Sequence, residues 1–492
     1  MSIAVRAVDL RVLNMRTRMP FRYGIASMTA LPHLFVRVEI EMDGQRQAGL
    51  ASEGLPPKWF TKDPRTTFRD DLADMLRAIR HACALALEAG DAPSVFALWQ
   101  RVHDRQSAWG VGEGYPPLLS GLGTSLVERA VIDAFCRATG RSFARAVREG
   151  TLGISLGAVH PELAGAHPAD LLPAQPLRAI IVRHTIGLTD PLTDDDVPAG
   201  EHLDDGLPQS LAACIRVYGL THFKIKLAGD TAKDLDRLER IARVLCGTAG
   251  ERFAFTLDGN EQYHDVLAFR AFWRALTGEP SLAPFMGRLL FVEQPLQRDV
   301  ALSADAGQAL RAWEDRPAII IDESDGAVES LPLALERGYA GTSYKNCKGV
   351  LRGIANACLI AHRNRAAAES SRDAAGRGYV LSGEDLANVG PVALLQDLAA
   401  MATLGIEHVE RNGHHYFAGL SMLPEDVQRD VLACHGDLYR RHERGFPALE
   451  VHGGTIQVGS VVDAPFGPRF LLDVSRFTSL DEWRFGSLGL NE

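Results

Sequence analysis

Five short apolar segments between residues 222 and 348 carry or end in charged side chains, and these charges are the residues best suited to chemistry. In chain order they are Lys224, Lys226, Asp258, Glu293, Asp322 and Lys345. Three carboxylates brought together repel one another unless a cation neutralises them. Carboxylate oxygens without Cys or His ligands suit Mg²⁺, or Mn²⁺ in its place. The residue types therefore predict acids that hold a divalent cation beside lysine amines.

The elements that position these charges are predicted to be neighbouring strands of one parallel barrel. Apolar runs separated by helix-length stretches are typical of strands buried on both faces. From residue 226 to 258, 293, 322 and 345 the successive gaps are 32, 35, 29 and 23 positions. That is the length of one strand–helix unit when about 250 residues make eight units. Catalytic groups of such barrels project from the C-terminal strand ends, so the charges should converge on one mouth.

Further apolar runs complete eight units. We expect strands at 178–182, 379–381 and 406–410, helices at 211–218, 350–361 and 392–404, and a polar stretch at 364–377. In the segment 223–227, alternation should turn Phe223 and Ile225 outward and both lysines into the barrel. A buried lysine beside another cation has a lowered pKa, which makes it a usable base. Lys345 would approach from the opposite side, so two amines could act on the carbon next to a carboxylate.

The first 150 residues have a different pattern, typical of an α+β domain. Residues 34–43 alternate between apolar and charged, and Asp43-Gly44 is typical of a type I′ hairpin turn. Three helices are predicted, at 68–87, from Ser94, and from a capping box at 125–128. We expect binding loops at 18–25 and 53–59, and an ordinary loop at the glycine-rich segment 110–114.

Together, several short motifs resemble the enolase superfamily, in particular its muconate lactonizing enzyme branch within the mandelate racemase/muconate lactonizing enzyme family. They are Lys224-Ile225-Lys226, Asp258-Gly259-Asn260, Glu293-Gln294-Pro295, Asp322-Glu323-Ser324 and Lys345-Asn346-Cys347-Lys348. Each is weak alone, but five in order at this spacing are a specific signal. The resemblance covers nearly the whole chain. Sites of this superfamily use a Lys or His base with Mg²⁺.

The resemblance implies a modified, enolase-like (β/α)₈ TIM barrel of the α/β class with an N-terminal α+β capping domain. It implies a capping domain at 1–150 with substrate-closing loops, a linker or insertion at 151–177, the barrel at 178–420, and a C-terminal segment at 421–492 that packs back on the capping domain. Gly383-Glu384-Asp385 after the seventh strand departs from the His-Asp pair of mandelate-racemase-type members, so that type is disfavoured.

The resemblance also implies roles for individual residues. Asp258, Glu293 and Asp322 match the metal ligands, Lys226 the acid/base lysine, Lys224 its electrostatic companion, Lys345 the lysine of the sixth strand, and Asn260 and Glu323 the positions around the metal. Expected substrate contacts are Arg22, Tyr23, Trp59, Glu384 and His414. Lys345 could instead only pair with a metal-ligating acid, and Lys348, which we expect in solvent at a helix start, could compete for its role.

The implied function is removal of a proton α to a substrate carboxylate by a Mg²⁺-dependent isomerase or lyase, with an enediolate stabilised by the metal. Racemisation or epimerisation, dehydration and cycloisomerisation share this first step. Two other functions stay open. A barrel lysine could form a Schiff base, as in aldolases and lyases. The chain could also be a catalytically inactive binding barrel, although it keeps every lysine and acid of the set.

Composition limits the partners. The net charge is −10, from 52 basic and 62 acidic residues, which argues against nucleic acid or an anionic membrane as the main partner. Seven scattered cysteines without a CxxC motif are typical of reduced thiols. No apolar stretch reaches about 18 residues, and the N-terminus does not have a signal-peptide pattern. We therefore expect a cytoplasmic protein that takes a small carboxylate substrate, and the family resemblance suggests a homo-oligomer.

Overall fold

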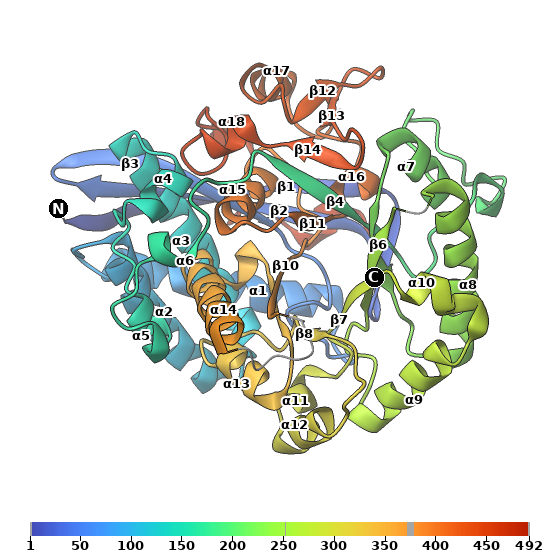
Figure 1. Cartoon of the computed structure of the whole chain (residues 1–492). Coiled ribbons are helices and arrows are strands. Elements are labelled where there is room, and N and C mark those ends of the chain that lie inside the picture. The colour runs from blue at the N-terminus through green and yellow to red at the C-terminus, as the bar shows by residue number, and fades with distance from the viewer. Residues whose placement is uncertain (1, 251, 371–377, 491–492) are drawn as a thin grey trace.

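A closed barrel of eight parallel strands forms the centre of the computed structural model, which describes residues 2–250, 252–370 and 378–490. Its strands are β4 (Ala179–Ile186), β5 (His222–Lys226), β6 (Ala254–Asp258), β7 (Leu289–Glu293), β8 (Ile319–Ile321), β9 (Gly341–Tyr344), β10 (Val380–Gly383) and β11 (His408–Arg411). Pairing of β11 with β4 closes the ring (Figure 1). The predicted α/β barrel is confirmed.

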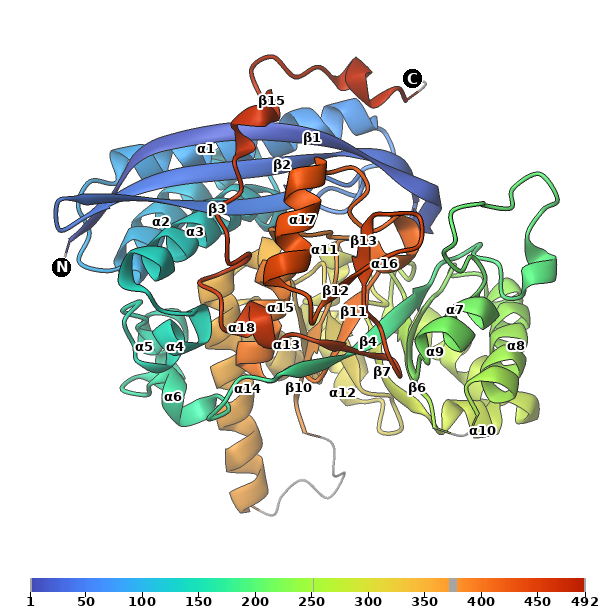
Figure 2. The same cartoon turned by 90° about the horizontal axis from the view of Figure 1, so that it is seen from above.

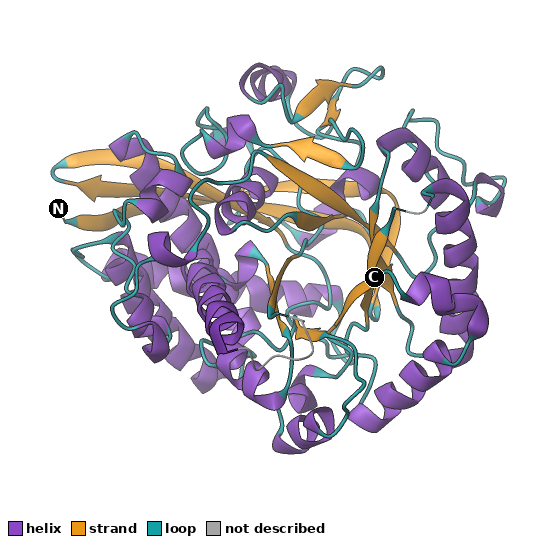
Figure 3. Ribbon diagram, viewed as in Figure 1, coloured by secondary structure: helices purple, strands orange, loops and turns teal. Residues whose placement is uncertain are grey.

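Helices cover the outside of the barrel, with strands at the centre (Figure 3). They are α7 (Leu211–Tyr218), α8 (Thr231–Thr248), α9 (Val266–Thr277), α10 (Ala283–Met286), α11 (Arg298–Ala301), α12 (Ala304–Arg311), α13 (Ser330–Arg337), α14 (Val350–Ser370), α15 (Ala393–Leu404) and α16 (Gly413–Tyr416). Each long amphipathic helix buries its apolar stripe against the strands. The polar stretch predicted from residue 364 is partly wrong, because α14 continues to Ser370; residues 371–377 lie outside the described part.

An N-terminal antiparallel sheet lies against the barrel (Figure 2). Its strands are β1 (Ile3–Tyr23), β2 (Ala26–Met42) and β3 (Gln45–Gly54), backed by α1 (Phe68–Glu88), α2 (Val95–Glu113) and α3 (Pro117–Thr139). Asp43 and Gly44 join β2 to β3 with positive φ values of 50° and 80°, as a type I′ turn requires. Ser94 caps α2 by accepting the Ala97 N–H at 3.1 Å, as predicted.

Three local predictions in this domain are wrong. Residues 18–25 are mostly strand, because β1 and β2 pair up to Tyr23 and Ala26 and leave only a tight turn. The glycine-rich segment 110–114 is the last turn of α2 and its left-handed cap at Gly114. Ser125 lies inside α3, which starts at Pro117, and its hydroxyl donates to the Leu122 carbonyl rather than capping a helix.

The segment after the barrel divides between the two parts of the molecule. It contains α17 (Glu425–Cys434), α18 (Gly459–Val462), β12 (Tyr439–Arg441), β13 (Pro447–Leu449), β14 (Thr455–Gln457) and β15 (Thr478–Ser479). β14 joins the barrel sheet antiparallel to β4, whereas β15 pairs with β1 of the N-terminal sheet. The prediction that the whole segment packs on the capping domain is thus wrong for β14. The first residues of β4, before the part that pairs with β5, have a free edge, and β14 pairs with it.

Residues 151–177 form short helical turns between the N-terminal domain and the first barrel strand. After α4 (Phe143–Arg148) come α5 (Leu156–Val159) and α6 (Pro168–Leu171). The seven cysteines are all free thiols. Among the described residues, no helix combines the length and apolar character needed to cross a bilayer.

Candidate active site

Strand register places Lys226, Asp258 and Glu293 side by side. Lys226 pairs with Asp258 across β5 and β6, and Asp258 pairs with Glu293 across β6 and β7. Phe223 and Ile225 point outward into the helix layer, while both lysines of β5 point into the barrel and are buried. The alternation predicted from the sequence is therefore the one that the barrel uses.

Lys224 lies at the centre of four buried carboxylates. Its Nζ lies 3.0 Å from Asp258 Oδ2, 2.7 Å from Glu293 Oε2, 2.7 Å from Glu384 Oε2 and 3.1 Å from Glu410 Oε2. Burial alone would lower the pKa of Lys224, but these carboxylates raise it well above its ordinary value. The expectation of a lowered lysine pKa is wrong here, because acids outnumber the neighbouring amine.

Lys226 and Lys345 line the same cavity. This cavity of about 410 Å³ lies over the C-terminal ends of the strands. Its polar floor consists of Lys224, Lys226, Asn260, Asp322, Lys345, Asp385, Glu410 and Asn412, and its apolar lid of Phe21, Tyr23, Met28, Pro56, Trp59, Leu386 and Ala387. Lys226 donates to Asp258 Oδ2 at 2.6 Å. The cavity thus brings two amines, from β5 and the end of β9, to one space.

Lys345 is held between an acid and an aromatic ring. It donates to Asp322 Oδ2, and its Nζ lies 4.9 Å from the centroid of the Trp59 ring. Burial works against the charge, yet Asp322 raises the pKa of Lys345 above its ordinary value. The predicted alternative, that Lys345 pairs with a metal-ligating acid, is therefore present as its contact with Asp322, while the same amine also lines the cavity.

Lys348 is buried, contrary to the expectation that it faces solvent. It lies 2.8 Å from Asp322 Oδ1 and donates to the Asp322 carbonyl at 2.7 Å and to Ser343 Oγ at 2.7 Å. The turn at Asn346–Lys348 before α14 folds its side chain back toward β8. Lys348 does not line the cavity of Lys226 and Lys345, so the structure favours Lys345 for contact with substrate.

The oxygen atoms around β6, β7 and β8 fit a hard divalent cation by their chemistry. Both carboxylate oxygens of Glu293, Asn260 Oδ1 and Glu323 Oε2 are buried without a hydrogen-bond partner. The 2.7 Å approach of Lys224 to Glu293 is an ion pair outside hydrogen-bonding geometry. Burial, reinforced by Asp258 and Glu384, raises the pKa of Glu293 well above its ordinary range. Unpartnered hard oxygens in a buried acidic group are suitable ligands for Mg²⁺.

The predicted ligands are nevertheless separated by lysines. Among the described His, Cys, Asp and Glu side chains, only one group of three has ligand atoms all within 4.8 Å of one another, and it is not Asp258, Glu293 and Asp322. Lys224 contacts both Asp258 and Glu293, while Lys345 and Lys348 hold Asp322. The three acids therefore share one site, but each is charge-paired to an amine.

Two of the five expected substrate contacts line the cavity, and three do not. Tyr23 presents its ring there while its hydroxyl donates to the Pro57 carbonyl at 2.9 Å, and Trp59 forms part of the lid. Arg22 points away and donates to Thr189 Oγ1 at 2.7 Å. Glu384 is turned beneath the floor, where it pairs with Arg183 and Lys224. These contacts explain why Arg22 and Glu384 do not reach the cavity.

His414 also lies elsewhere, behind the barrel wall. Its Nε2 is 3.1 Å from His184 Nδ1. Burial, with His184 adding to it, lowers the pKa of His414 well below its ordinary value. His414 does not line the cavity of Lys226 and Lys345, so its contact with substrate stays a prediction.

Sequence reasoning missed Glu410, which contacts Lys224 and lines the cavity. A signal was present, since Glu410 lies near the C-terminal end of the eighth strand, where the other acids lie on their strands. Of the lid residues, Phe21 and Pro56 lie in the segments 18–25 and 53–59 that are predicted to bind, whereas Met28 carries no comparable signal. They reach the cavity only because the N-terminal sheet is docked over the barrel mouth.

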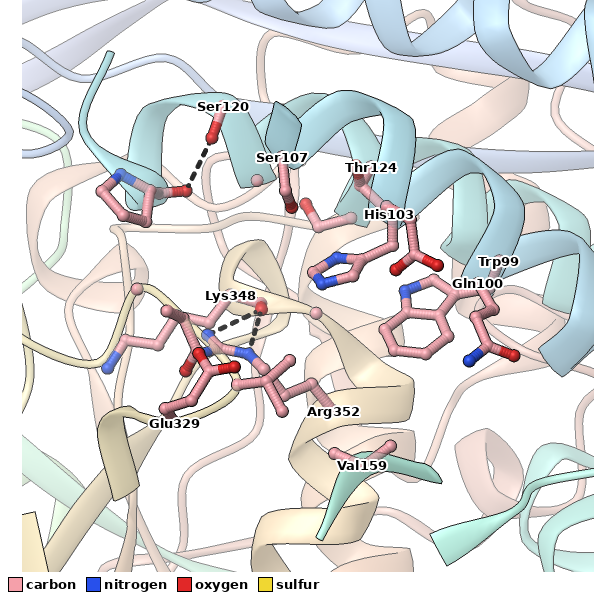
Figure 4. A pocket seen from close by; sticks show the side chains of 18 of the residues that line it. Trp99, Gln100, His103, Ser107, Ser120, Thr124, Val159, Glu329, Lys348 and Arg352 are labelled. Atoms are coloured by element: carbon pink, nitrogen blue, oxygen red, sulfur yellow. Dashed lines mark hydrogen bonds between the residues drawn. The ribbon is translucent and has the colours of Figure 1, made fainter. Parts of the chain in front are cut away.

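A second, wider cleft lies between α2 and α3 and the barrel segment 326–352 (Figure 4). Trp99, Gln100 and His103 face Glu329, Lys348 and Arg352 across it. Of the lysines and acids described above for the candidate active site, only Lys348 lines this cleft. Arg352 is already paired with Asp325 at 2.9 Å. The cleft therefore lacks the opposed amines that the smaller cavity has.

Comparison with known proteins gives the fold. No protein-family model and no curated protein sequence matches the chain. Solved structures do: a muconate lactonizing enzyme from Pseudomonas fluorescens complexed with muconolactone (TM-score 0.55, 16% identity, 97% of each chain covered), and an N-succinyl Arg/Lys racemase from Bacillus cereus (0.55, 15%, 94% of this chain and 97% of that one).

An enolase from Bradyrhizobium complexed with magnesium and mandelic acid is also similar (TM-score 0.53, 14% identity, 93% of this chain and 96% of that one). Many of the similar structures are mandelate racemase/muconate lactonizing enzyme-like members of the enolase superfamily. At these identities the likeness establishes the fold, a barrel with an N-terminal capping domain, and this part of the predicted resemblance is confirmed.

Proposed function

We propose that the chain is a Mg²⁺-dependent enzyme of the enolase-superfamily type that removes the proton α to a substrate carboxylate. The observation that carries the proposal is that Lys226 and Lys345, from opposite sides of the barrel, line one cavity. The kinds of enzyme among the similar structures support the same reaction type. Racemisation or epimerisation, dehydration and cycloisomerisation are the overall reactions compatible with this step.

Asp258, Glu293 and Asp322 would hold the cation, with Asn260 and Glu323 beside them. Bound Mg²⁺ would neutralise the negative charge that develops on the substrate carboxylate as its α-proton leaves. Manganese could substitute, since it accepts the same oxygen ligands. The apolar lid would exclude water and pack against the rest of a small carboxylate substrate.

The two lysines have different partners, which suggests different roles. Asp322 favours the charged form of Lys345, so Lys345 suits the role of proton donor at neutral pH. Lys226 would then serve as the base and accept the α-proton, and the electron pair of the C–H bond would move into the carboxylate. A Schiff base at Lys345 is less consistent with the site, because a charged, ion-paired amine is a poor nucleophile.

Deuterium exchange tests this assignment. Carboxylic acids with an α-hydrogen would be incubated with enzyme and Mg²⁺ in D₂O, and exchange followed by NMR. Lys226→Ala should abolish α-exchange, roughly a hundredfold or more below wild type. Lys345→Ala should retain exchange but lose the completed reaction. Lys233→Ala, an exposed lysine in α8, is the matched control.

Exchange that persists in Lys226→Ala, or that survives chelation of divalent cations, would overturn the proposal. A borohydride-trapped adduct on Lys345 would favour the Schiff-base mechanism instead. A cytoplasmic location and a homo-oligomeric assembly remain part of the proposal, and size-exclusion chromatography with light scattering tests the assembly.

A further inference from the structure

A compact group of nitrogen and sulfur ligands lies outside the candidate active site. His184, Cys214 and His415 each direct a ligand atom into one space, and these atoms all lie within 4.8 Å of one another. The three side chains come from β4, α7 and α16, and all are buried. Their neighbours on β4, Arg183 and Thr185, point into the barrel instead, so the group lies on the outer face of the barrel wall.

The geometry points to a buried site for a zinc-like divalent cation, and we propose that His184, Cys214 and His415 bind one. Cys214 Sγ lies 3.6 Å from His415 Nδ1. Two ligands of a tetrahedral zinc ion, with bonds of about 2.3 Å to sulfur and 2.0 Å to nitrogen, are separated by about 3.6 Å. A thiolate with imidazoles favours Zn²⁺ over Mg²⁺, which prefers oxygen. This site is therefore distinct in chemistry from the carboxylate site.

A carboxylate lies near the far ring nitrogen of one of the three ligands. His415 turns Nδ1 to the thiol, while its Nε2 faces Asp190 Oδ2 at 4.0 Å. Asp190 is itself fixed by the Gly187 N–H at 2.7 Å and the Tyr416 hydroxyl at 2.6 Å. Histidine ligands usually have such a carboxylate on the far ring nitrogen.

A nearby carboxylate and a further histidine also suit a bound cation. A cation of charge +2 with one thiolate leaves one positive charge, which the Asp190 carboxylate balances. His414 Nε2 lies 3.1 Å from His184 Nδ1 and could orient that ring. His414 Nδ1 is buried without a hydrogen-bond partner among the described residues. It is therefore a further polar atom near the proposed site whose hydrogen-bonding capacity is unused.

The cluster is placed where a bound cation would stabilise the lid. His415 belongs to α16, which directly follows the cavity residue Asn412. The next residue, Tyr416, stacks on Phe21 of the lid with ring centroids 4.1 Å apart, and Arg18 of β1 donates to the His415 carbonyl at 2.7 Å. A cation here would tie α7 and α16 to β4 and support the lid from behind.

Metal binding to the full chain tests this proposal directly. Protein stripped with a chelator would be dialysed against Zn²⁺ with excess Mg²⁺, which occupies oxygen sites, and its metal content measured by elemental mass spectrometry. Co²⁺ would be added in parallel to look for the thiolate-to-metal charge-transfer band. Wild type should bind about one Zn²⁺ per chain and show the band with Co²⁺.

Variants separate this site from any other. Cys214→Ser should lose the band, and His415→Gln should bind Zn²⁺ at least about tenfold more weakly. Asp190→Asn should keep the band with about tenfold weaker binding. Cys136→Ser, a buried cysteine of α3 outside the group, should behave as wild type. Absence of the band in wild-type protein, or a band unchanged in Cys214→Ser, would show a hydrogen-bonded core cluster instead.

Discussion

At the scale of single residues, Lys224 is the charge on which the arrangement of the site depends. Four carboxylates, Asp258, Glu293, Glu384 and Glu410, lie within 3.1 Å of its Nζ. The residue was expected to be an electrostatic companion of Lys226. Its contacts show that it also neutralises acids at the ends of four different strands, β6, β7, β10 and β11, so its loss should affect the stability of the barrel.

We expect Lys224→Met to destabilise the protein by about 3–5 kcal/mol, because removing one partner leaves buried charges unpaired. Urea unfolding followed by circular dichroism measures the change. Lys233→Met, which removes a lysine whose side chain is 79% exposed, should change stability by about 1 kcal/mol or less. Equal stabilities of the two variants would show that the four acids do not depend on Lys224.

Trp59 is the lid residue whose role can be tested by a matched pair. Its ring contacts the Lys345 ammonium, whereas Arg22, expected from the sequence to play a similar part, binds Thr189. Once a substrate is known, Trp59→Leu should lower kcat/KM roughly tenfold, since both packing and a cation–π contact are lost. Arg22→Ala should leave kcat/KM within about twofold. A larger effect of Arg22→Ala would show that Arg22 contacts substrate, as predicted from the sequence.

At the scale of elements, α3 of the capping domain is joined to the start of α14 of the barrel. Glu128 of α3 accepts the Val350 N–H at the first turn of α14. Burial raises the pKa of Glu128 to about 8, although this hydrogen bond and Arg129 act in the opposite direction. Burial outweighs these contacts, so the buried position of Glu128 costs least when its carboxyl group is protonated.

This pKa gives a pH dependence with a defined sign. Because the folded-state pKa lies above the ordinary value of 4.5, the contribution of Glu128 is fully present below pH 4.5 and is lost as the pH rises through 8. Glu128→Gln, which cannot ionise, should remove that loss, which amounts to at most about 1.4 kcal/mol per pH unit.

Urea unfolding of wild type and Glu128→Gln at pH 5, 6.5 and 8 measures the difference. The variant should gain stability relative to wild type as the pH rises. Glu88→Gln, at an exposed glutamate of α1 with 60% side-chain exposure, should run parallel to wild type. A constant difference between wild type and Glu128→Gln would show that Glu128 does not titrate in this range.

At the scale of the whole molecule, the C-terminal segment fastens the capping sheet. Leu480 donates its N–H to the Leu10 carbonyl at 3.0 Å, and Trp483 Nε1 donates to Asn14 Oδ1 at 2.8 Å. Figure 2 shows this red segment crossing the outer edge of β1. The buried apolar residues within 471–490 are Leu472, Val474, Phe477, Leu480, Trp483 and Leu488.

Removal of residues 471–492 should therefore cost about 5 kcal/mol or more, at roughly 1.5–3 kcal/mol for each large apolar side chain that loses its burial. Hydrogen exchange followed by mass spectrometry should show lost protection in β1 first. Protection of the barrel strands should change less, because their sheet does not include β15. Unchanged protection in β1 would show that the sheet is stable without this edge.

The sequence by itself determined the barrel and the strand ends that carry the lysines and three of the acids of its site. Strands buried on both faces leave long apolar runs, and a period of two fixes which side chain points inward. Lys224, Lys226, Asp258, Glu293, Asp322 and Lys345 could therefore be placed at one mouth from their spacing alone. Local turn and cap signals such as Asp43-Gly44 and Ser94 were also sufficient, because those interactions lie within a few residues.

Only the tertiary structure decided which residues cover the floor and which amine each acid contacts. Phe21 and Trp59 reach the cavity because the capping sheet docks over the barrel, and Arg22 and His414 leave it for partners that are distant in sequence. Likewise, His184, Cys214 and His415 are separated by 30 positions or more along the chain. Such groupings depend on how separately formed elements pack against one another. Local periodicity in the sequence cannot predict that packing.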